Sequence, residues 1–473
     1  MATELDKRGA GILLKSSFWY LFSTVLLNGI SFLVTPFFTR MMSLDEYGQY
    51  NNYSSWEAIF SIFITFNLSV TILSAYGDYK ANMRDYYFSM CVFMLGLSSV
   101  FAVIAVVFNE PLHAWTSLDT KYLLLIIAYS IGNSILSLFQ SQQRMEFRYK
   151  TSTAITIAVA LSKTLLAIIF VVLMEEKAFA RVLGNTIPIF VFGILLFLFY
   201  AKNSDRLNVS YWKYALPLAI PYIPHTLSMT LLNSMDKTMI TNICGNEYTA
   251  IYSVAYTCGS IVIVILMALN TAYSPWLREK IELNQPEKVR KFSYIYIGIG
   301  VCICIGVILF APEIILLFGG AKYSQAVYVL PPIALGCMMQ FLYTMFVNIE
   351  QIQKHTFEMA VASCIAALVN LVLNFILIPK LGYIAAAYTT LIGYLVLLFI
   401  HMYVIKRIKM EKYYNYRFIF FVAAIMLGLG TIINLVYENI ILRIILILFV
   451  TAVIIVISIK IKLVDKLFSL KTK

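Results

Sequence analysis

Residues 357–405 read FEMAVASCIAALVNLVLNFILIPKLGYIAAAYTTLIGYLVLLFIHMYVI and contain two apolar runs, 357–379 and 382–405, joined by a short Ile-Pro-Lys turn. Each run is close to the roughly 20 residues that a helix needs to cross the hydrocarbon core of a bilayer. Lys380 is the charge in the turn, whereas a series of basic residues begins after the second run at Lys406. The stretch therefore predicts a membrane helical hairpin with its positive charge concentrated on one side.

The same pattern extends over the whole chain and gives about fourteen predicted spans. These are 17–39, 51–75, 87–108, 121–140, 152–174, 179–200, 214–235, 249–273, 293–318, 326–349, 357–379, 382–405, 418–436 and 440–459. Most of the 36 basic residues lie in alternate loops, on the side of the N-terminus. The exceptions are Lys163, which lies inside a span, and Arg40, Lys121, Lys177, Arg181, Lys237, Lys322, Lys380 and Arg443. The positive-inside rule and the even number of spans then place both termini in the cytoplasm.

Composition agrees with a chain that lies almost entirely in the membrane. Of its 473 residues, 61% are hydrophobic and only 13% are charged, which leaves no room for an extramembrane domain. The net charge of +12 lies mostly in the predicted cytoplasmic loops, where topology and anionic headgroups explain it, so no nucleic-acid partner is expected. Most of the seven cysteines fall within spans and are expected to be small buried residues rather than metal ligands.

The first twelve spans are interpreted as two copies of a six-span unit. The loop SLDEYGQY (43–50) after the first span matches CGNEYT (244–249) after the seventh. Because six is even, both copies would enter the membrane in the same direction, as parallel repeats around a central cleft. The alternative is that polar, Tyr-rich loops recur by chance. The repeat predicts a lobe at 1–206, a second lobe at 207–410, and two extra helices with a basic cytoplasmic tail at 411–473.

Several stretches, in this order and spacing, resemble the polysaccharide exporters of the multidrug/oligosaccharidyl-lipid/polysaccharide (MOP) superfamily. The resemblance is strongest to the bacterial Wzx-type flippases of O-antigen and capsule repeat units. The matching stretches are TRMMSLDEYGQY (39–50), KYALPLAIPYIP (213–224), NSMDKTMITNICGNEYTAIYSVAY (233–256), FGGAKYSQAVYVLPPIAL (318–335) and VNLVLNFILIPKLGYIAAAYTTLIGY (369–394).

This resemblance implies a MATE-like, all-α membrane fold with two six-helix bundles around a central cleft and two additional C-terminal helices. It implies an undecaprenyl-diphosphate-type lipid-linked oligosaccharide as substrate, moved by alternating access from the cytoplasmic to the outer leaflet of a bacterial inner membrane. Membrane lipids and the polysaccharide polymerase machinery are the expected partners. No cofactor is expected, and coupling to a proton or sodium gradient remains open.

Other functions stay open as alternatives. A multidrug exporter, or a lipid II or teichoic-acid exporter, would belong to the same superfamily. A membrane-embedded glycan enzyme is less favoured, because the outer loops are short and Glu175-Glu176 is the only acidic pair. No nucleotide-binding motif is present, which argues against pumping driven by ATP. We therefore expect a transporter without catalytic residues.

The cations that topology does not explain are the first candidates for substrate binding. Lys163 lies deep in TAITIAVALSKTLLAIIFVVL, where an isolated charge is costly. It is predicted to compensate the charge of a diphosphate in the cavity or to pair with a carboxylate from another helix. Arg40 and the pair Asp236-Lys237 end spans one and seven, at places related by the repeat. They form either an outer gate, in which Asp236 pairs with one of the two cations, or an interfacial anchor.

Span seven carries three prolines on nearly one face, at positions 217, 221 and 224. Each proline removes a backbone donor, so Pro217, Pro221 and Pro224 predict a bent or partly unwound helix, which would serve as a hinge. The alternative is an ordinary proline-containing membrane helix. The adjacent His225 is a candidate for proton transfer, although a lone histidine among apolar residues is usually a packing residue.

Ion coupling requires a titratable group inside the membrane. Glu57, about two turns into span two, is the first candidate, and Asp236 is the second. Asn370 and Asn374, one turn apart in span eleven, are predicted either to bind sugar hydroxyls or to bond to another helix.

Overall fold

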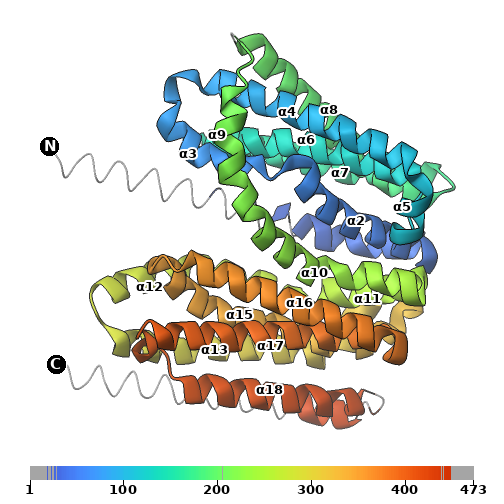
Figure 1. Cartoon of the computed structure of the whole chain (residues 1–473). Helices are drawn as coiled ribbons and strands as arrows, with labels where there is room; N and C mark the ends of the chain where they lie inside the picture. The colour runs from blue at the N-terminus through green and yellow to red at the C-terminus, as the bar shows by residue number, and fades with distance from the viewer. Residues whose placement is uncertain are drawn as a thin grey trace. The chain divides into compact units, whose positions relative to one another are not determined.

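In a computed structural model, the structure describes residues 29–437 apart from 147 and 205, together with residues 19, 23, 26, 27, 439 and 441–448. The beginning of predicted span one, most of span fourteen and the basic tail lie outside the described residues, as do the two termini. Within the described part every regular element is a helix, and there is no strand (Figure 1).

The helices of the described part follow the predicted spans. The first half holds a helix at residues 29–41, α2 (Leu44–Thr65), η1 (Leu68–Thr71), α3 (Ile72–Asp78), η2 (Lys80–Asn82), α4 (Met83–Val107), α5 (Asn109–Thr116), α6 (Thr120–Met145), α7 (Tyr149–Leu173) and α8 (Lys177–Asn203). The second half holds α9 (Ser210–Ala219), η3 (Ile220–Tyr222), α10 (Ile223–Cys244), α11 (Asn246–Gly259), α12 (Ile261–Glu282), α13 (Pro286–Leu309), α14 (Ala311–Phe318), η4 (Ala321–Tyr328), α15 (Leu330–Ile352), α16 (Thr356–Leu381), α17 (Ile384–Arg407), η5 (Glu411–Tyr413) and α18 (Tyr416–Val436). Each predicted span from the second to the thirteenth has a helix at its place.

Ten helical stretches of the described part are long and apolar enough to cross a membrane. At the second predicted span, α2 and the η1–α3 segment meet at 50°, and they make an eleventh stretch if the pair is counted as one broken span. The break lies at Phe66 and Asn67, whose φ angles of 48° and 52° are left-handed. At its other end, α2 begins with a capping box, in which the side chains of Ser43 and Glu46 each accept a backbone N–H from the other residue.

The chain divides into two compact units that do not follow the sequence order. The first unit comprises 1–254, 318–322 and 356–393, and the second comprises 255–317, 323–355 and 394–473. The lobes predicted from the internal repeat stay a prediction. In the first unit, tyrosines of α4 and α9, including Tyr86, Tyr87 and Tyr211, pack with apolar residues from the broken second span. In the second unit α15 is almost completely buried and packs against α12, α13 and α18.

Small residues let helices of the first unit approach closely. A Cβ atom on Gly193 of α8 would lie 2.5 Å from Cα of Gly132 in α6, and a Cβ on Gly132 would lie 2.5 Å from the carbonyl oxygen of Ile189. Likewise, a Cβ on Gly184 would lie 2.4 Å from Cα of Ala167 in α7. Such close approach is typical of helix pairs in membranes, because lipid supplies no hydrophobic drive for helices to associate.

Replacing Gly193 by a large residue should therefore separate α6 from α8. We expect Gly193→Leu to destabilise the protein by about 1–3 kcal/mol through overpacking and to lower its thermal midpoint in detergent. Gly96→Leu in α4 is the matched control, since a Cβ at Gly96 meets nothing within 4 Å. Equal melting temperatures for the two variants would contradict this view of the packing.

Candidate functional site

Asp236 of α10 is the most buried of the charged site residues predicted from the sequence, with only 1% of its surface exposed. Its carboxylate accepts hydrogen bonds from Tyr252 of α11 at 2.6 Å, from Asn374 of α16 at 2.6 Å, and from Thr390 of α17. All four residues belong to the first unit. A carboxylate buried among membrane helices is thus satisfied by three neutral donors from three other helices.

A second layer of hydrogen bonds surrounds this carboxylate. Asn370 donates to the Thr390 hydroxyl at 3.1 Å, Asn374 also donates to the Asn370 side-chain oxygen at 3.2 Å, and Thr389 donates to Asn374. The structure therefore brings together Asp236, Asn370 and Asn374, which the sequence suggested separately. We call the six residues Asp236, Tyr252, Asn370, Asn374, Thr389 and Thr390 the Asp236 network.

A second polar group lies inside the first unit, between α2, α6 and α7. Ser61 donates to Glu57 at 3.0 Å and bonds to Ser130 at 2.8 Å. Lys163 donates to the Tyr129 hydroxyl at 3.2 Å, and its Nζ lies 5.2 Å from the centre of that ring. Glu57 and Lys163 are close enough to interact electrostatically. Lys163, the first candidate for cavity charge, and Glu57, the first candidate for ion coupling, therefore lie in the same polar group.

Arg181 of α8 extends this group toward the end of the helix at 29–41. Its guanidinium carbon lies 3.7 Å from the ring centre of Tyr50 and 4.0 Å from that of Phe38. Asn185, one turn further along α8, donates to the Tyr50 hydroxyl at 3.1 Å. The distribution of basic residues placed Arg181 in a loop on the predicted outer side. Nothing in the neighbouring sequence indicates that its guanidinium stacks between aromatic rings. We call Tyr50, Glu57, Ser61, Tyr129, Ser130, Lys163, Arg181 and Asn185 the N-terminal polar cluster.

The two loops that match in sequence contact each other in the structure. A Cβ on Gly48 would lie 1.8 Å from the carbonyl oxygen of Asn246, so only glycine fits there. The Asn246 side chain donates to Asp45 at 3.0 Å. Beside them, Asn242 of α10 accepts from Ser117 at 2.7 Å and donates to the Trp115 carbonyl of α5 at 2.9 Å. The two loops therefore contact each other at this end of the first unit, the predicted outer end.

Cations bind the carbonyl groups at the C-terminal end of the helix at 29–41. Arg40 donates to the Pro36 carbonyl at 3.0 Å, Lys177 donates to that of Met41 at 2.6 Å, and Lys322 donates to that of Met42. Positive charge is favourable where a helix leaves its last carbonyls unpaired. Burial lowers the pKa of Lys322 from its ordinary value, while Glu46 acts in the opposite direction and Lys177 in the same.

The predicted gate residues take different positions. Asp236 is held in its network, and Arg40 is exposed at the helix end. Lys237 is half-buried, and its carbonyl accepts from Thr249 at 3.4 Å. The gate in which Asp236 would pair with Arg40 or Lys237 when the cleft is closed stays a prediction.

The proline segment of span seven departs from a regular α-helix. A 3-10 turn, Ile220–Tyr222, separates α9 from α10, and Pro217, Pro221 and Pro224 are all exposed. His225 lies in the first turn of α10, and its buried Nδ1 has no hydrogen-bond partner among the described residues. The backbone irregularity predicted from the prolines is present, while hinge motion stays a prediction.

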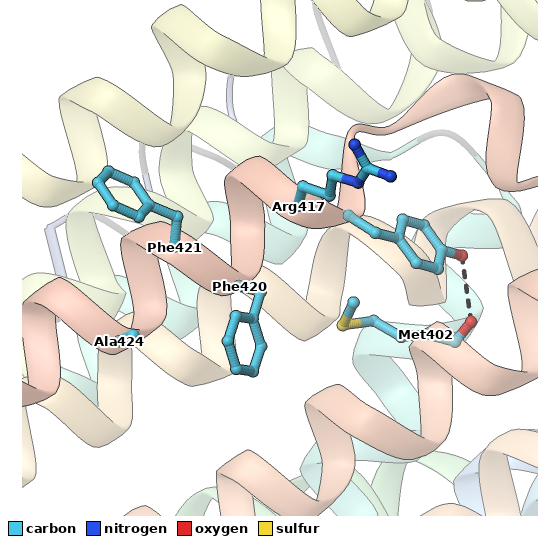
Figure 2. A pocket seen from close by; sticks show the side chains of 6 residues that line it. Met402, Arg417, Phe420, Phe421 and Ala424 are labelled. Carbon is cyan, nitrogen blue, oxygen red and sulfur yellow. Dashed lines mark hydrogen bonds between the residues drawn. The ribbon is translucent and has the colours of Figure 1, made fainter.

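Two apolar grooves accompany these sites. One, of about 590 Å³, lies in the first unit and is lined by Trp115, Met235, Met239, Asn242, Ile243, Leu371, Val372, Phe375 and Ile376. The other, of about 460 Å³, lies in the second unit between α17 and α18, where Figure 2 shows Phe420, Phe421 and Arg417 around it. The first groove runs between α10 and α16, the helices that carry Asp236 and Asn374.

Comparison with known proteins assigns the chain to a family. The family model described as polysaccharide biosynthesis protein matches residues 13–281, which is more than half of the chain. The chain belongs to this family. A second family model, MatE, matches residues 221–376. The resemblance to the MOP superfamily noted from the sequence is confirmed.

The relatives of this polysaccharide biosynthesis family member support the fold. An uncharacterised membrane protein of Haemophilus influenzae is 23% identical in a match 421 residues long that covers 85% of this chain and 99% of the relative. Among solved structures, lipid II flippase MurJ in an inward closed conformation matches with a TM-score of 0.66 and 14% identity, over 92% of this chain and 100% of the other. A MATE multidrug resistance transporter of the MOP superfamily, inward-facing, matches with a TM-score of 0.60 and 14% identity, over 83% and 94%. The predicted MATE-like helical fold is thus confirmed.

The Gly48–Asn246 contact offers a direct test of the closed end. We expect Gly48→Leu to force the two loops apart, because its side chain has no room beside the Asn246 carbonyl. Cys244, at the end of α10, is a natural reporter. In a background with the other six cysteines replaced by serine or alanine, maleimide should label Cys244 severalfold faster in Gly48→Leu than in the parent. The control is Gly77→Leu, where a Cβ meets nothing within 4 Å. Unchanged labelling would show that this contact does not hold the end closed.

Proposed function

We propose that the protein is a flippase that moves a polyprenyl-diphosphate-linked oligosaccharide, of the undecaprenyl type, across a bacterial inner membrane for surface polysaccharide assembly. The observation that carries the proposal is the N-terminal polar cluster. It holds two cations, one carboxylate and several hydroxyl groups within the spanning helices of a polysaccharide biosynthesis family member. O-antigen or capsule repeat units are the proposed cargo. A multidrug substrate, or lipid II or teichoic acid, is the alternative.

The chemistry of the cluster suits a diphosphate joined to sugars. Lys163 has three N–H donors, and Tyr129 receives one of them, which leaves donors for phosphate oxygens. Arg181 presents a planar set of donors that matches phosphate geometry in a bidentate manner. The rings of Tyr50 and Tyr129 and the amide of Asn185 supply surfaces and hydrogen bonds for sugar rings. An exporter of cationic drugs would instead be expected to present carboxylates without nearby lysine and arginine.

The substrate also needs a path for its lipid chain. The groove between α10 and α16 is lined by Met235, Met239, Leu371 and Phe375, apolar residues whose faces suit a hydrocarbon chain. The closed contact at Gly48 and Asn246 supports alternating access, since a transporter must close one end while the other exchanges substrate.

We further propose that the Asp236 network is the coupling site for a proton or a sodium ion. The carboxylate is enclosed by oxygen-bearing side chains of Tyr252, Asn374 and Thr390 from three other helices. Oxygen atoms are the ligands that hard cations prefer, and a carboxylate can instead take up a proton. Either ligand would replace hydrogen bonds that now hold α10 to α11, α16 and α17, so its binding would alter how these helices pack.

Substitution of Lys163 tests the substrate site. We expect Lys163→Gln to lower transport of lipid-linked saccharide by about tenfold or more, because a hydrogen bond to a charged group contributes about 1.5–3 kcal/mol. Surface polysaccharide in the native host and flipping in proteoliposomes are the two measurements. Lys150→Gln is the control, since it makes the same charge change at an exposed position on the same helix. Full polysaccharide export by Lys163→Gln would overturn the role of the cluster.

Substitution of Asp236 tests the coupling site. The wild-type protein should gain thermal stability in detergent on replacing KCl by NaCl, or on lowering the pH, by up to about 2.7 kcal/mol at a hundredfold excess over the dissociation constant. Asp236→Asn should lose that response. Glu57→Gln is the comparison variant, since Glu57 is the other candidate carboxylate. Loss of the response in Glu57→Gln alone would move ion coupling to the N-terminal polar cluster.

A further inference from the structure

The second unit contains a buried acid–base pair that the proposed transport sites do not use. Glu350, near the end of α15, is 0% exposed at its side chain, and His401, near the end of α17, is 2% exposed. Nδ1 of His401 lies 2.9 Å from one carboxylate oxygen of Glu350 and 3.0 Å from the other. The two residues lie on different helices and are 51 positions apart in the sequence.

Aromatic rings enclose the imidazole on one side. The ring of Tyr343 in α15 stacks on His401, with centroids 5.5 Å apart and planes at 17°. Tyr394 of α17 stacks in turn on Tyr343 at 6.3 Å and 22°. The imidazole is therefore held in one orientation by a carboxylate at its edge and by a phenol ring on its face.

The other titratable groups around the pair are mostly tyrosines. From α18, Tyr416 donates to the Met402 carbonyl at 3.1 Å (Figure 2) and interacts electrostatically with Glu350 and with Glu411 of η5. Tyr414, which precedes α18, bonds to Tyr273 of α12, and Tyr296 of α13 packs on Phe341 of α15. In the turn after α15, the backbone N–H of His355 donates to the Glu350 carbonyl.

The charge of such a pair depends on how many protons it holds. A histidine changes charge near neutral pH, which few other side chains do. With one proton shared between them, Glu350 and His401 form a pair of no net charge. Loss of that proton leaves a buried carboxylate facing a neutral imidazole, and gain of a second leaves an imidazolium without its counter-charge. Both states are costly inside a membrane protein, so the proton number should influence how α15 and α17 pack.

We propose that Glu350 and His401 form a proton-binding site in the second unit, separate from the Asp236 network. The ligand is a proton, and the group that reports its binding is the imidazole of His401. The site ties α15 to α17, and through Tyr416 and Met402 it adjoins the contact between α17 and α18. The proposal concerns proton binding alone and does not depend on which substrate the chain transports.

Histidine NMR spectroscopy of the full-length protein tests this site. The chain has only four histidines, so a variant with His113, His225 and His355 replaced by Gln carries His401 as its single labelled imidazole, with the pair untouched. We expect the ¹³Cε1 signal of His401 to shift with pH between about 5 and 9. In Glu350→Gln the pH dependence of this signal should differ from that of the parent, because the imidazole loses its carboxylate partner.

Two outcomes would overturn the proposal. A His401 signal that stays at one position over this pH range would show a pair of fixed protonation. A titration that Glu350→Gln leaves unchanged would show that the carboxylate does not share the proton. If Glu350→Gln does not fold, Glu350→Asp, which keeps the charge but lengthens the contact, provides the second variant. The transport assays of Lys163 and Asp236 variants read out different sites, so the two sets of results are independent.

Discussion

Every polar group within a membrane span must find its partner inside the protein, because the hydrocarbon offers none. This constraint accounts for the arrangement of the sites. Asp236 cannot be wetted, and four helices meet around it to supply its hydrogen bonds. Lys163 cannot lie in lipid, and its ammonium rests on the hydroxyl and ring of Tyr129. Each of these buried polar residues therefore also determines which helices pack together.

The fold was predictable from the sequence because a membrane-spanning chain must alternate long apolar segments with polar loops. Apolar runs and basic loops give the positions of the spans, and the prolines at 217, 221 and 224 indicate the irregular backbone found at Ile220–Tyr222. The broken second span was not predictable in the same way. Its break at Phe66 and Asn67 has neither proline nor glycine. Asn adopts the left-handed conformation more readily than most residues, but Phe does not, so no strong local signal indicates the break.

The sequence indicated the charged residues of the sites but not most of their hydrogen-bond and stacking partners. Charged residues such as Asp236, Glu57 and Lys163 stand out in apolar segments, and Asn370 and Asn374 are recognisable as a pair one turn apart. Their partners Tyr252 and Thr390 are common residue types whose importance depends on which helices meet. Arg181 appeared as one of several outer basic residues, although it stacks between two aromatic rings. Glu350 and His401 lie on different spans, and no spacing rule connects them. The roles of all these residues depend on tertiary contacts, which local sequence patterns do not reveal.

The lysines that cap the helix at 29–41 have an electrostatic consequence. While the loops at Gly48 and Asn246 touch, the ammonium groups of Lys177 and Lys322 are occupied by the carbonyls of Met41 and Met42. A movement that separated the lysines from these carbonyls would expose two ammonium groups at this end of the first unit. Such a change is screened by salt over a Debye length of about 8 Å at physiological ionic strength. The electrostatic cost of such a separation would thus vary with ionic strength.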